Sequence, residues 1–381
     1  MNNISVDGTA PGPVVSVVVP TYNERENLSE LAQRLDEALS SNWDWEMIIV
    51  DDDSPDGTAW TARDLARSNN RIRCIQRLGR RGLSSAVVEG MLASSAENFV
   101  VMDGDLQHDE AIVDTMLTAL KADTYDIAVG TRYAKGGGSG TWDASRARQS
   151  SLANNAARSI LGVELSDPMS GFFAINRDTF GKSVRNLSQL GFKILLDIVV
   201  SSPSPPRVQE FPYQFQVRER GDSKLDSAAI WDFFLLLVEK RIGKLVPARL
   251  ISFGLVGGLG VIVHLGTMQI LFSLLSLSYV VAHSIGTLTA LTSNYLLNNA
   301  LTFRDRRRTG WGLVTGWLSF AVICSVGMMG NVSVANWLFE RDSWWVLSSV
   351  AGILVGVIWN YSVSSVVTWR LKSDSQRDID F

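Results

Sequence analysis

Four long apolar stretches fill the last third of the chain, at about residues 250–273, 279–301, 313–338 and 345–368. A helix needs roughly 20 apolar residues to cross a bilayer, and each stretch is near or above that length. Charged residues make up only 19 % of the chain, below the roughly 25 % of soluble domains. Buried core helices are the alternative, but none of the stretches has a polar face. We therefore expect an all-α membrane domain of four transmembrane helices over residues 248–370.

Charge in the connections predicts how these helices are oriented. Basic residues precede the first stretch and follow the last, and the connection 304–310 is strongly basic, whereas 276–278 is uncharged and 340–343 has one arginine. The positive-inside rule then places both termini in the cytoplasm. Tryptophans near the span ends are typical of an aromatic belt, and they are Trp311, Trp344, Trp345 and Trp369. The prediction is an integral membrane protein whose other domain is cytoplasmic.

Residues 14–226 have a different pattern, in which short apolar runs alternate with amphipathic stretches. The runs are typical of buried strands, and they are VVSVVVP (14–20), WEMIIVDDD (45–53), IRCIQ (72–76), NFVVMDGD (98–105) and YDIAVGTR (125–132). Helical spacing appears between the first two, at Leu28, Leu31, Leu35 and Leu39. Alternating strands and helices predict an α/β domain with a mostly parallel sheet. Ligands bind such sheets beyond the carboxyl ends of the strands.

The remaining segments complete the predicted organisation. Residues 1–13 are expected to be a flexible tail, and residues 371–381 a cytoplasmic one. Residues 227–247 form an amphipathic region that ends in basic residues. It fits a helix lying in the membrane interface, or an ordinary packing helix of the soluble domain. The segment SSPSPPRVQEFP (201–212) is rich in proline and serine, which predicts a surface connection.

Acidic side chains crowd the end of the fourth apolar run, in VVMDGDLQHDE (100–110). Asp103, Asp105 and Gln107 lie at i, i+2 and i+4, so they point the same way in an extended or turning segment. Two carboxylates and an amide oxygen suit Mg²⁺ or Mn²⁺, ions that also bind substrate phosphates. The pattern predicts a metal site that offsets the charge of a diphosphate leaving group, with a solvated turn as the alternative. His108 is predicted to be a surface turn residue.

Two other strand ends carry side chains suited to a nucleotide. Pro20 ends the first run, after which Tyr22 offers a ring for base stacking and Glu24 an acceptor for a ribose or base, although the segment also fits a helix start. The run at 48–58 ends in three aspartates, which could accept hydrogen bonds from a base edge or lie in a solvated turn. The chain lacks GxGxxG after the first run and lacks a phosphate-binding P-loop. A nucleotide would therefore be held by acidic residues and a metal.

Basic residues later in the chain suit a second phosphate. Arg132 follows a predicted strand, and Arg146 and Ser150 are spaced by four, so they share one helix face. Arg218 and Lys224 bracket the segment RERGDSK. Each fits a solvated basic face by itself, but together, beside four predicted spans, they favour an anionic lipid head group. The formal net charge of −4 gives no support to a nucleic-acid partner.

These motifs resemble the dolichol-phosphate mannose synthases, which are inverting GT-A glycosyltransferases of family 2. The resembling segments cover residues 14 to about 225, and they are VVVPTYNERENL, VDDDSPDGT, RGLSSAV, VVMDGDLQHDE, VGTRYAKGG, DPMSGFFAINR, GFKILLDI and RERGDSKL. The membrane part resembles the four-span GtrA-like domain fused to some family members. Its segments NYLLNNALTF (294–303) and NYSVSSVVTW (360–369) resemble the repeated span ending of that domain, which implies an internal two-fold repeat of hairpins.

The resemblance implies roles for individual residues. The nucleotide sugar would be bound by Pro20, Tyr22, Glu24, Ile49, Asp51, Asp103, Gly104, Arg218 and Lys224. The metal, Mg²⁺ or Mn²⁺, would be held by Asp105 and Gln107, and the lipid phosphate by Arg132, Arg146 and Ser150. The catalytic residues would be Asp103, Asp105 and Arg132. The chain departs from the family at Gly104, where alanine is usual, and at Asp109, where proline is usual, but neither change removes a donor or ligand.

The resemblance also implies an activity, the transfer of mannose from GDP-mannose to dolichyl or another polyprenyl phosphate with inversion. A phosphate nucleophile is already anionic at pH 7, which fits the lack of an obvious base after the metal motif. Two alternatives stay open. UDP-glucose could be the donor on the same scaffold. A lipid-linked-sugar transporter or flippase with a vestigial soluble domain is the other, because polar residues such as His264 and Asn294 lie within the predicted spans.

Overall fold

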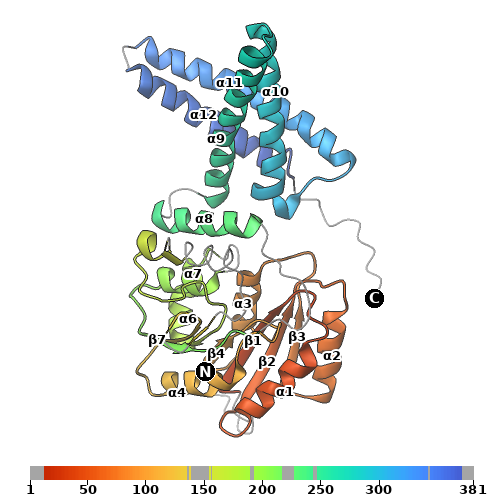
Figure 1. Ribbon diagram of the computed structural model, residues 1–381, viewed down its shortest axis with the longest axis vertical. Coiled ribbons are helices and arrows are strands. Elements are labelled where there is room, and N and C mark those ends of the chain that lie inside the picture. The colour runs from red at the N-terminus through yellow and green to blue at the C-terminus, as the bar shows by residue number, and fades with distance from the viewer. Residues whose placement is uncertain are drawn as a thin grey trace, which may run out of the picture. The chain divides into compact units, whose positions relative to one another are not determined.

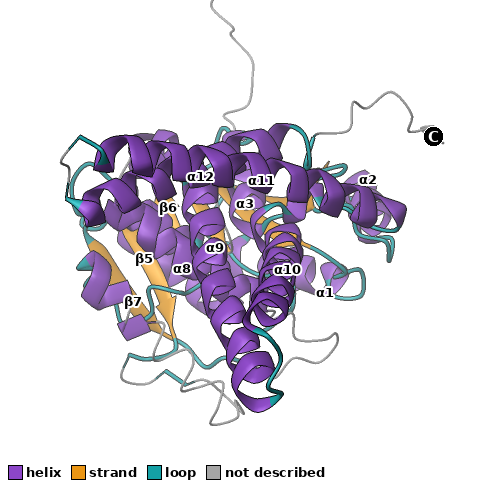
Figure 2. Ribbon diagram, turned by 90° about the horizontal axis from the view of Figure 1, so that it is seen from above, coloured by secondary structure: helices purple, strands orange, loops and turns teal. Residues whose placement is uncertain are grey.

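The structure, a computed structural model, describes residues 13–134, 137–138, 154–155, 157–188, 193–216, 227–242, 247–341 and 344–370. The chain divides into two compact units, Met1–Arg241 and Ile242–Phe381. The first combines helices with a sheet, and the second is helical (Figures 1 and 2).

The strands of the first unit are β1 (Val15–Thr21), β2 (Trp45–Asp51), β3 (Ile72–Gln76), β4 (Asn98–Val101), β5 (Ile127–Thr131), β6 (Phe173–Asn176) and β7 (Val208–Pro212). Its α-helices are α1 (Leu28–Leu39), α2 (Thr58–Ser68), α3 (Leu83–Leu92), α4 (Val113–Lys121), α6 (Arg177–Ser183), α7 (Ile194–Ser201) and α8 (Ser227–Ile242). Short 3₁₀ turns are η1 (Glu110–Ile112) and η2 (Val184–Asn186).

Within the described residues, these strands form one sheet in the order β3-β2-β1-β4-β6-β5-β7. Strand β6 is antiparallel to β4 and β5, and every other pairing is parallel. The predicted mostly parallel α/β sheet is therefore confirmed. The interpretation of 201–212 as a surface connection was wrong at its end, because Val208–Pro212 pairs with β5 as the edge strand β7. Proline is tolerated there because an edge strand needs fewer ladder hydrogen bonds.

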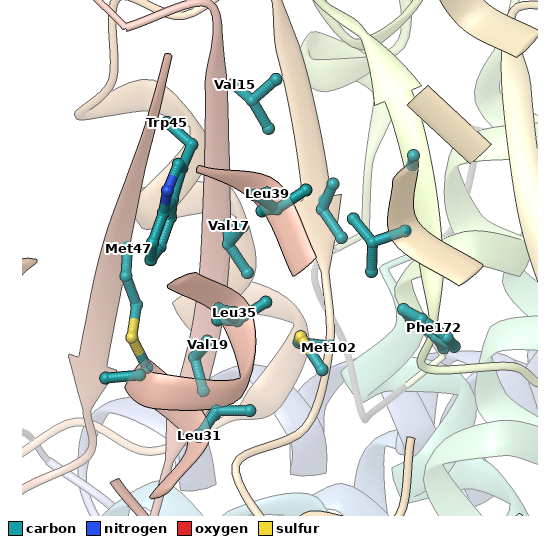
Figure 3. Close-up of a cluster of buried hydrophobic side chains, with 14 of the residues drawn as sticks. Val15, Val17, Val19, Leu31, Leu35, Leu39, Trp45, Met47, Met102 and Phe172 are labelled. Atoms are coloured by element: carbon teal, nitrogen blue, oxygen red, sulfur yellow. The ribbon is translucent and has the colours of Figure 1, made fainter. Parts of the chain in front are cut away.

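The core lies on both faces of the sheet, which explains why the strands read as continuous apolar runs. Alternate side chains of β1 point to opposite faces. Val17 and Val19 pack with Leu31 and Leu35 of α1 in one cluster, which also includes residues of α4 (Figure 3). Val18 packs in the other cluster, with residues of α3, α6 and α7. The sheet is thus held between two helical layers.

Helix α8 covers most of the region predicted to be an interface helix or a packing helix. Leu236 and Leu237 are buried in the cluster that also holds α3 and α7. Lys240 Nζ lies 2.6 Å from the Asp197 carboxylate of α7, which is itself buried. The helix therefore packs on the α/β unit.

The second unit contains α9 (Ala248–Met268), α10 (Tyr279–Leu297), α11 (Trp311–Phe339) and α12 (Trp345–Val366). The π-helical turns η3 (Gln269–Leu274) and η4 (Asn298–Thr302) extend α9 and α10, and η5 (Arg304–Arg306) is a short 3₁₀ turn. Helix α9 lies beside α10, and α11 lies beside α12 (Figure 2).

Three helical segments among the described residues are long and apolar enough to cross a membrane, namely Arg249–Leu274, Trp311–Phe339 and Trp345–Val366. These correspond to three of the four predicted spans. The remaining one, α10, is a helix of 19 residues, but it contains histidine, serine, threonine and asparagine, and it does not reach the same hydropathy. The structure therefore supports three apolar spans, and the fourth is not confirmed.

The two helix pairs repeat each other's contacts. Ser252 of α9 shares a hydrogen bond of 2.7 Å with Thr302, and Ser319 of α11 shares one of 2.9 Å with Thr368. A similar correspondence holds at two glycines, where a Cβ would come within 2.3 Å of Asn294 at Gly260 and within 2.1 Å of Asn360 at Gly327. Asparagine side chains thus fill close helix contacts, as expected for polar residues that join membrane helices.

Trp369 was predicted to belong to an aromatic belt, and that prediction is wrong. Its indole is fully buried and stacks on Phe303 with ring centroids 4.2 Å apart. Its Nε1 donates to Asn299 Oδ1 at 3.0 Å. A buried indole needs such an acceptor, because an unpaired N–H away from water is costly. The other three belt tryptophans, Trp311, Trp344 and Trp345, are exposed.

Candidate active site

A pocket of about 270 Å³ opens at the carboxyl ends of β1, β2 and β4. Its lining residues are Pro20, Thr21, Tyr22, Glu24, Asp52, Leu83, Asp103, Gly104 and Asp105. Parallel strands bring these ends to one edge, which is why segments far apart in sequence meet here. A larger depression of about 870 Å³ lies near the opposite strand ends, around Val14 and Asn98, and it contains none of the predicted site residues.

The turn after β4 presents the predicted metal ligands. Asp105 Oδ1 accepts a hydrogen bond of 3.2 Å from the backbone N–H of Gln107. The Gln107 side chain donates through Nε2 to Gln216 O at 3.0 Å, so its amide oxygen is the atom that a metal would use. Leu106, between the two, has φ +60°, an uncommon conformation for leucine, and its buried side chain packs in the core. Core packing therefore holds the turn.

His108 is not the surface residue that we predicted. Only 3 % of it is exposed, and its ring stacks on Phe172 with centroids 4.8 Å apart. Its Nδ1 accepts the backbone N–H of Asp103 at 3.1 Å. Burial lowers the pKa of His108 to about 4, so the ring is neutral and can accept this bond. His108 thus holds the backbone of the acidic turn Asp103–Asp105 from the side of the protein core.

The three aspartates after β2 have separate environments. Asp51 is fully buried, with Oδ2 accepting Ser54 N–H at 3.0 Å and Oδ1 accepting the Ser54 hydroxyl at 2.5 Å. These bonds form the turn, and Asp51 does not line the pocket, whereas Asp52 does. Burial raises the pKa of Asp52, although the N–H of Gly82 and the charge of Arg77 act against it. The resemblance implied a role for Asp51 and named none for Asp52, which is the aspartate that lines the pocket.

The nucleotide-binding residues predicted after β1 lie in the pocket wall. Pro20, Tyr22 and Glu24 all line it, and the Glu24 carboxylate accepts Asn27 Nδ2 at 2.8 Å. Ile49 was assigned to the same role, but its side chain is fully buried in the core cluster of β2.

Arg132 follows β5 and forms a bidentate ion pair with Asp167. Its Nε and Nη2 lie 2.8 and 3.1 Å from the two carboxylate oxygens, and Asp167 is fully buried. The guanidinium also lies 5.4 Å from the ring centroid of Phe215, whose ring centroid is 6.1 Å from that of His108. The acidic turn and Arg132 therefore flank one aromatic cluster. Four predicted residues, Arg146, Ser150, Arg218 and Lys224, lie outside the described residues.

Lys193 is a further candidate that sequence reasoning missed. Its Nζ donates to Met169 O at 3.3 Å. Burial lowers its pKa to about 7, repulsion by Arg132 adds to this, and Asp167 and Asp103 oppose it. The charge of Lys193 is therefore sensitive to an anion bound nearby. The sequence did contain an indication of this, because Lys193 lies inside the apolar segment GFKILLDI and lysine is rarely buried unless it has a partner.

The donor set fits a hard divalent ion that keeps several ligand positions for substrate and water. Among the described residues, no group of three or more His, Cys, Asp and Glu side chains could hold a metal by itself. Asp105 and Gln107 would supply one carboxylate and one amide oxygen, beside Asp103 in the same pocket wall. Mg²⁺ is often bound through one or two carboxylates plus substrate phosphates, so this sparse set is chemically reasonable.

Two protein families match separate parts of the chain. Residues 16–183 match "Glycosyl transferase family 2", and residues 252–369 match "GtrA/DPMS, transmembrane domain". Among solved structures, the α/β unit is similar to glucosyl-3-phosphoglycerate synthase from Mycobacterium tuberculosis, with TM-score 0.45 and 17 % identity, over 60 % of this chain and 80 % of that one.

The curated relatives cover more of the chain. A dolichol-phosphate mannosyltransferase from Pyrococcus furiosus is 34 % identical over 93 % of this chain and 99 % of its own length. Its counterpart from Saccharomyces cerevisiae is 37 % identical over 62 % of this chain and 91 % of its own length. Because the first match spans both the α/β unit and the membrane unit, this chain belongs to the dolichol-phosphate mannosyltransferase family, with a GtrA-type transmembrane domain.

Proposed function

We propose that the protein transfers mannose from GDP-mannose to dolichyl or another polyprenyl phosphate, with inversion at the anomeric carbon. The observation that carries this is that the acidic turn Asp103–Asp105 lines a pocket with Tyr22 and Glu24. Next to this turn, the His108 ring lies beside the Phe215 ring, and the guanidinium of Arg132, which is paired with Asp167, lies beside the same Phe215 ring. One side has the chemistry for a metal-bound nucleoside diphosphate. The other offers a cation to a phosphate acceptor.

In this mechanism the chain positions two anionic substrates for one in-line displacement. A phosphate oxygen of the acceptor forms a bond to the anomeric carbon as the bond to the nucleoside diphosphate breaks. The attacking oxygen carries no proton at pH 7, so no residue has to act as a base. Bound Mg²⁺ or Mn²⁺, held by Asp105 and Gln107, would offset charge on the leaving diphosphate. Catalysis then rests on orientation and on charge compensation by Arg132 and Lys193.

The donor test is a transfer assay in membranes that contain the protein, with polyprenyl phosphate as acceptor and radiolabelled nucleotide sugars as donors. We expect label from GDP-mannose, and not from UDP-glucose, in the lipid fraction. Preferential incorporation of glucose would instead support the UDP-glucose reading. Membranes without the protein are the control for endogenous transferases, and no transfer from any donor would favour the vestigial-domain alternative.

We also propose that the membrane unit has four spans, with α10 as the second, and that both termini and the α/β unit are cytoplasmic. The basis is the arginine-rich connection around Arg304–Arg306, because basic loops are retained on the cytoplasmic side. In a chain with Cys74 and Cys324 replaced by serine, an impermeant thiol reagent added outside the cell should label Ser276→Cys and spare Thr309→Cys. Labelling of Thr309→Cys alone would show that the orientation is the reverse of the proposed one. Labelling of neither cysteine, or of both, would refute four spans.

A further inference from the structure

A buried arginine near the pocket has no role in the mechanism above. Arg77 directly follows β3 and is 2 % exposed. Its Nη1 donates to Asp52 Oδ1 at 2.7 Å and to Gly82 O at 3.0 Å, and its Nη2 donates to Ser85 Oγ at 2.6 Å. Its Nε lies 2.9 Å from Glu89 Oε2. One guanidinium thus joins the end of β2 to the first turns of α3, and a buried charge in that position needs these partners.

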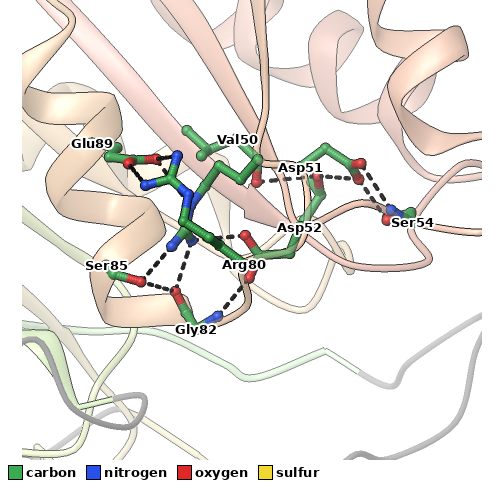
Figure 4. Close-up of polar contacts among 10 residues, drawn as sticks. Val50, Asp51, Asp52, Ser54, Arg80, Gly82, Ser85 and Glu89 are labelled. Carbon is green, nitrogen blue, oxygen red and sulfur yellow. Dashed lines mark hydrogen bonds and ion pairs between the residues drawn. The ribbon is translucent and has the colours of Figure 1, made fainter. Parts of the chain in front are cut away.

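Asp52 completes the connection from the other side. Its Oδ2 accepts the backbone N–H of Gly82 at 2.7 Å, a contact that Figure 4 shows between the two labelled residues. Because Asp52 Oδ1 bonds to Arg77, the carboxylate holds both Arg77 and the residue before α3. Gly82 has φ +145°, a conformation that side chains rarely adopt, and a Cβ there would lie 3.1 Å from Ser85 Oγ. Because Asp52 and Leu83 both line the pocket, this set of contacts fixes two of its walls relative to each other.

The loop between Arg77 and Gly82 also contacts the pocket wall directly. Arg81 lies between Arg77 and Gly82, and its guanidinium is 4.3 Å from the ring centroid of Tyr22, another lining residue. The connection from β3 to α3 is therefore held at Arg77 and Gly82 while it presents Leu83 and Arg81 to the donor side. A shift of this connection would change the pocket without touching the acidic turn.

A comparable arginine lies at the far end of the same three elements. Arg73 of β3 donates to Glu46 of β2 at 3.0 Å and to Ala93 O, at the end of α3, at 3.1 Å. It joins the same three elements, although 45 % of its side chain is exposed, and none of its partners lines the pocket. Comparing substitutions of Arg73 and Arg77 therefore distinguishes the effect of such an arginine on protein stability from its effect on donor binding.

We propose that Arg77 is a positioning residue for the nucleotide-sugar donor, acting through Asp52, Gly82 and Leu83. It does not touch the reacting atoms. Arg77 keeps the start of α3, with Leu83, in place beside the ends of the strands before the donor binds. Donor binding then does not have to pay the free-energy cost of ordering this part of the pocket. The inference rests on the proposed donor site and adds a residue that maintains its shape.

The test uses the full-length protein in membranes and in detergent, with Arg77→Gln, Arg77→Lys, Ser85→Ala and the control Arg73→Gln. We expect Arg77→Gln to raise the KM for GDP-mannose and the Kd for GDP about tenfold or more, because charge-assisted hydrogen bonds are lost. The kcat and the KM for polyprenyl phosphate should change by less than about threefold. Arg77→Lys keeps the charge beside Asp52 and should recover part of the donor affinity. Arg73→Gln should lower the unfolding temperature by less than Arg77→Gln, because the Arg73 side chain is 45 % exposed, and it should leave both donor constants unchanged.

Ser85→Ala removes one contact and keeps the charge network, so it serves if Arg77→Gln does not fold, and it should raise the donor KM by a smaller factor. Donor constants at the wild-type value in folded Arg77→Gln, or in Ser85→Ala when Arg77→Gln does not fold, would overturn the proposal. A fall in kcat alone would overturn it too. Wild-type protein that transfers glucose from UDP-glucose instead of mannose from GDP-mannose would overturn the proposed function, and the Kd for UDP of wild type and Arg77→Gln would then test the positioning role.

Discussion

Replacing Asp105 by alanine is expected to abolish metal-dependent transfer of mannose to the lipid. The carboxylate is the only acidic ligand in the proposed metal set of Asp105 and Gln107, and it lines the donor pocket. Without it the ion would be lost or misplaced, and charge on the leaving diphosphate would go uncompensated. Loss of one preorganised electrostatic contact commonly costs about 10²–10³-fold in rate, so a fall of at least that order is expected. Initial rates over a Mn²⁺ titration measure it.

Asp109→Ala is the matched control for that variant. Asp109 is a carboxylate four residues further on, and it accepts Ala111 N–H at 3.1 Å at the start of η1 rather than facing the pocket. Its loss should leave transfer within a few-fold of wild type. If Asp105→Ala retained wild-type rates with the same Mn²⁺ dependence, the assignment of the metal to this turn would be wrong.

Much of the α/β unit was predictable because its signals are local. Strands covered on both faces have to be apolar throughout, so β1, β2 and β4 stand out as short runs of valine and isoleucine. Helix α1 repeats leucine at helical spacing, and those leucines are buried. Once the strands are parallel, the acidic residues after β1, β2 and β4 have to meet at one edge. That geometric rule predicted the pocket.

The features that were missed depend on distant segments. His108 is buried because Phe172 and Tyr213 cover it, and the segment VVMDGDLQHDE contains no residue pattern that predicts contact with those distant rings. Strand β7 contains a proline and follows a serine- and proline-rich stretch, so only its pairing with β5 reveals it. Trp369 resembles a surface tryptophan until its stacking on Phe303 is known. Long-range packing decides each case, and local composition does not record it.

The same argument explains why Asp52 and not Asp51 lines the pocket. Three consecutive aspartates look equivalent in sequence, but alternation along the chain turns neighbouring side chains to opposite sides. Asp51 bonds to Ser54 within its own turn, while Asp52 bonds to Arg77 and Gly82, which lie 25 and 30 residues further along. The sequence could therefore identify the cluster, and only the fold could assign its members.

Asp167→Ala is expected to be the most destabilising single change near the site. Asp167 is fully buried, and Arg132 is nearly so, with 11 % of its side chain exposed. Removing the carboxylate leaves a cation in the protein interior without its bidentate partner, which typically costs about 3–5 kcal/mol. The midpoint of thermal unfolding of the full chain in detergent measures this loss. The acceptor KM should also rise, because Arg132 loses the group that orients it.

The control uses an ion pair of the same bidentate geometry at the surface. The Arg207 guanidinium bonds to both oxygens of Asp126, at 3.1 and 2.7 Å, and the Arg207 backbone N–H donates to Asp126 Oδ2 at 2.7 Å, but 53 % of the arginine side chain and 22 % of the aspartate side chain are exposed. Exposed pairs contribute little to stability, since water screens the charges and solvates each partner after the other is removed. Asp126→Ala should therefore shift the unfolding midpoint far less than Asp167→Ala. Equal shifts for the two variants would show that burial does not set the strength of the Arg132 pair.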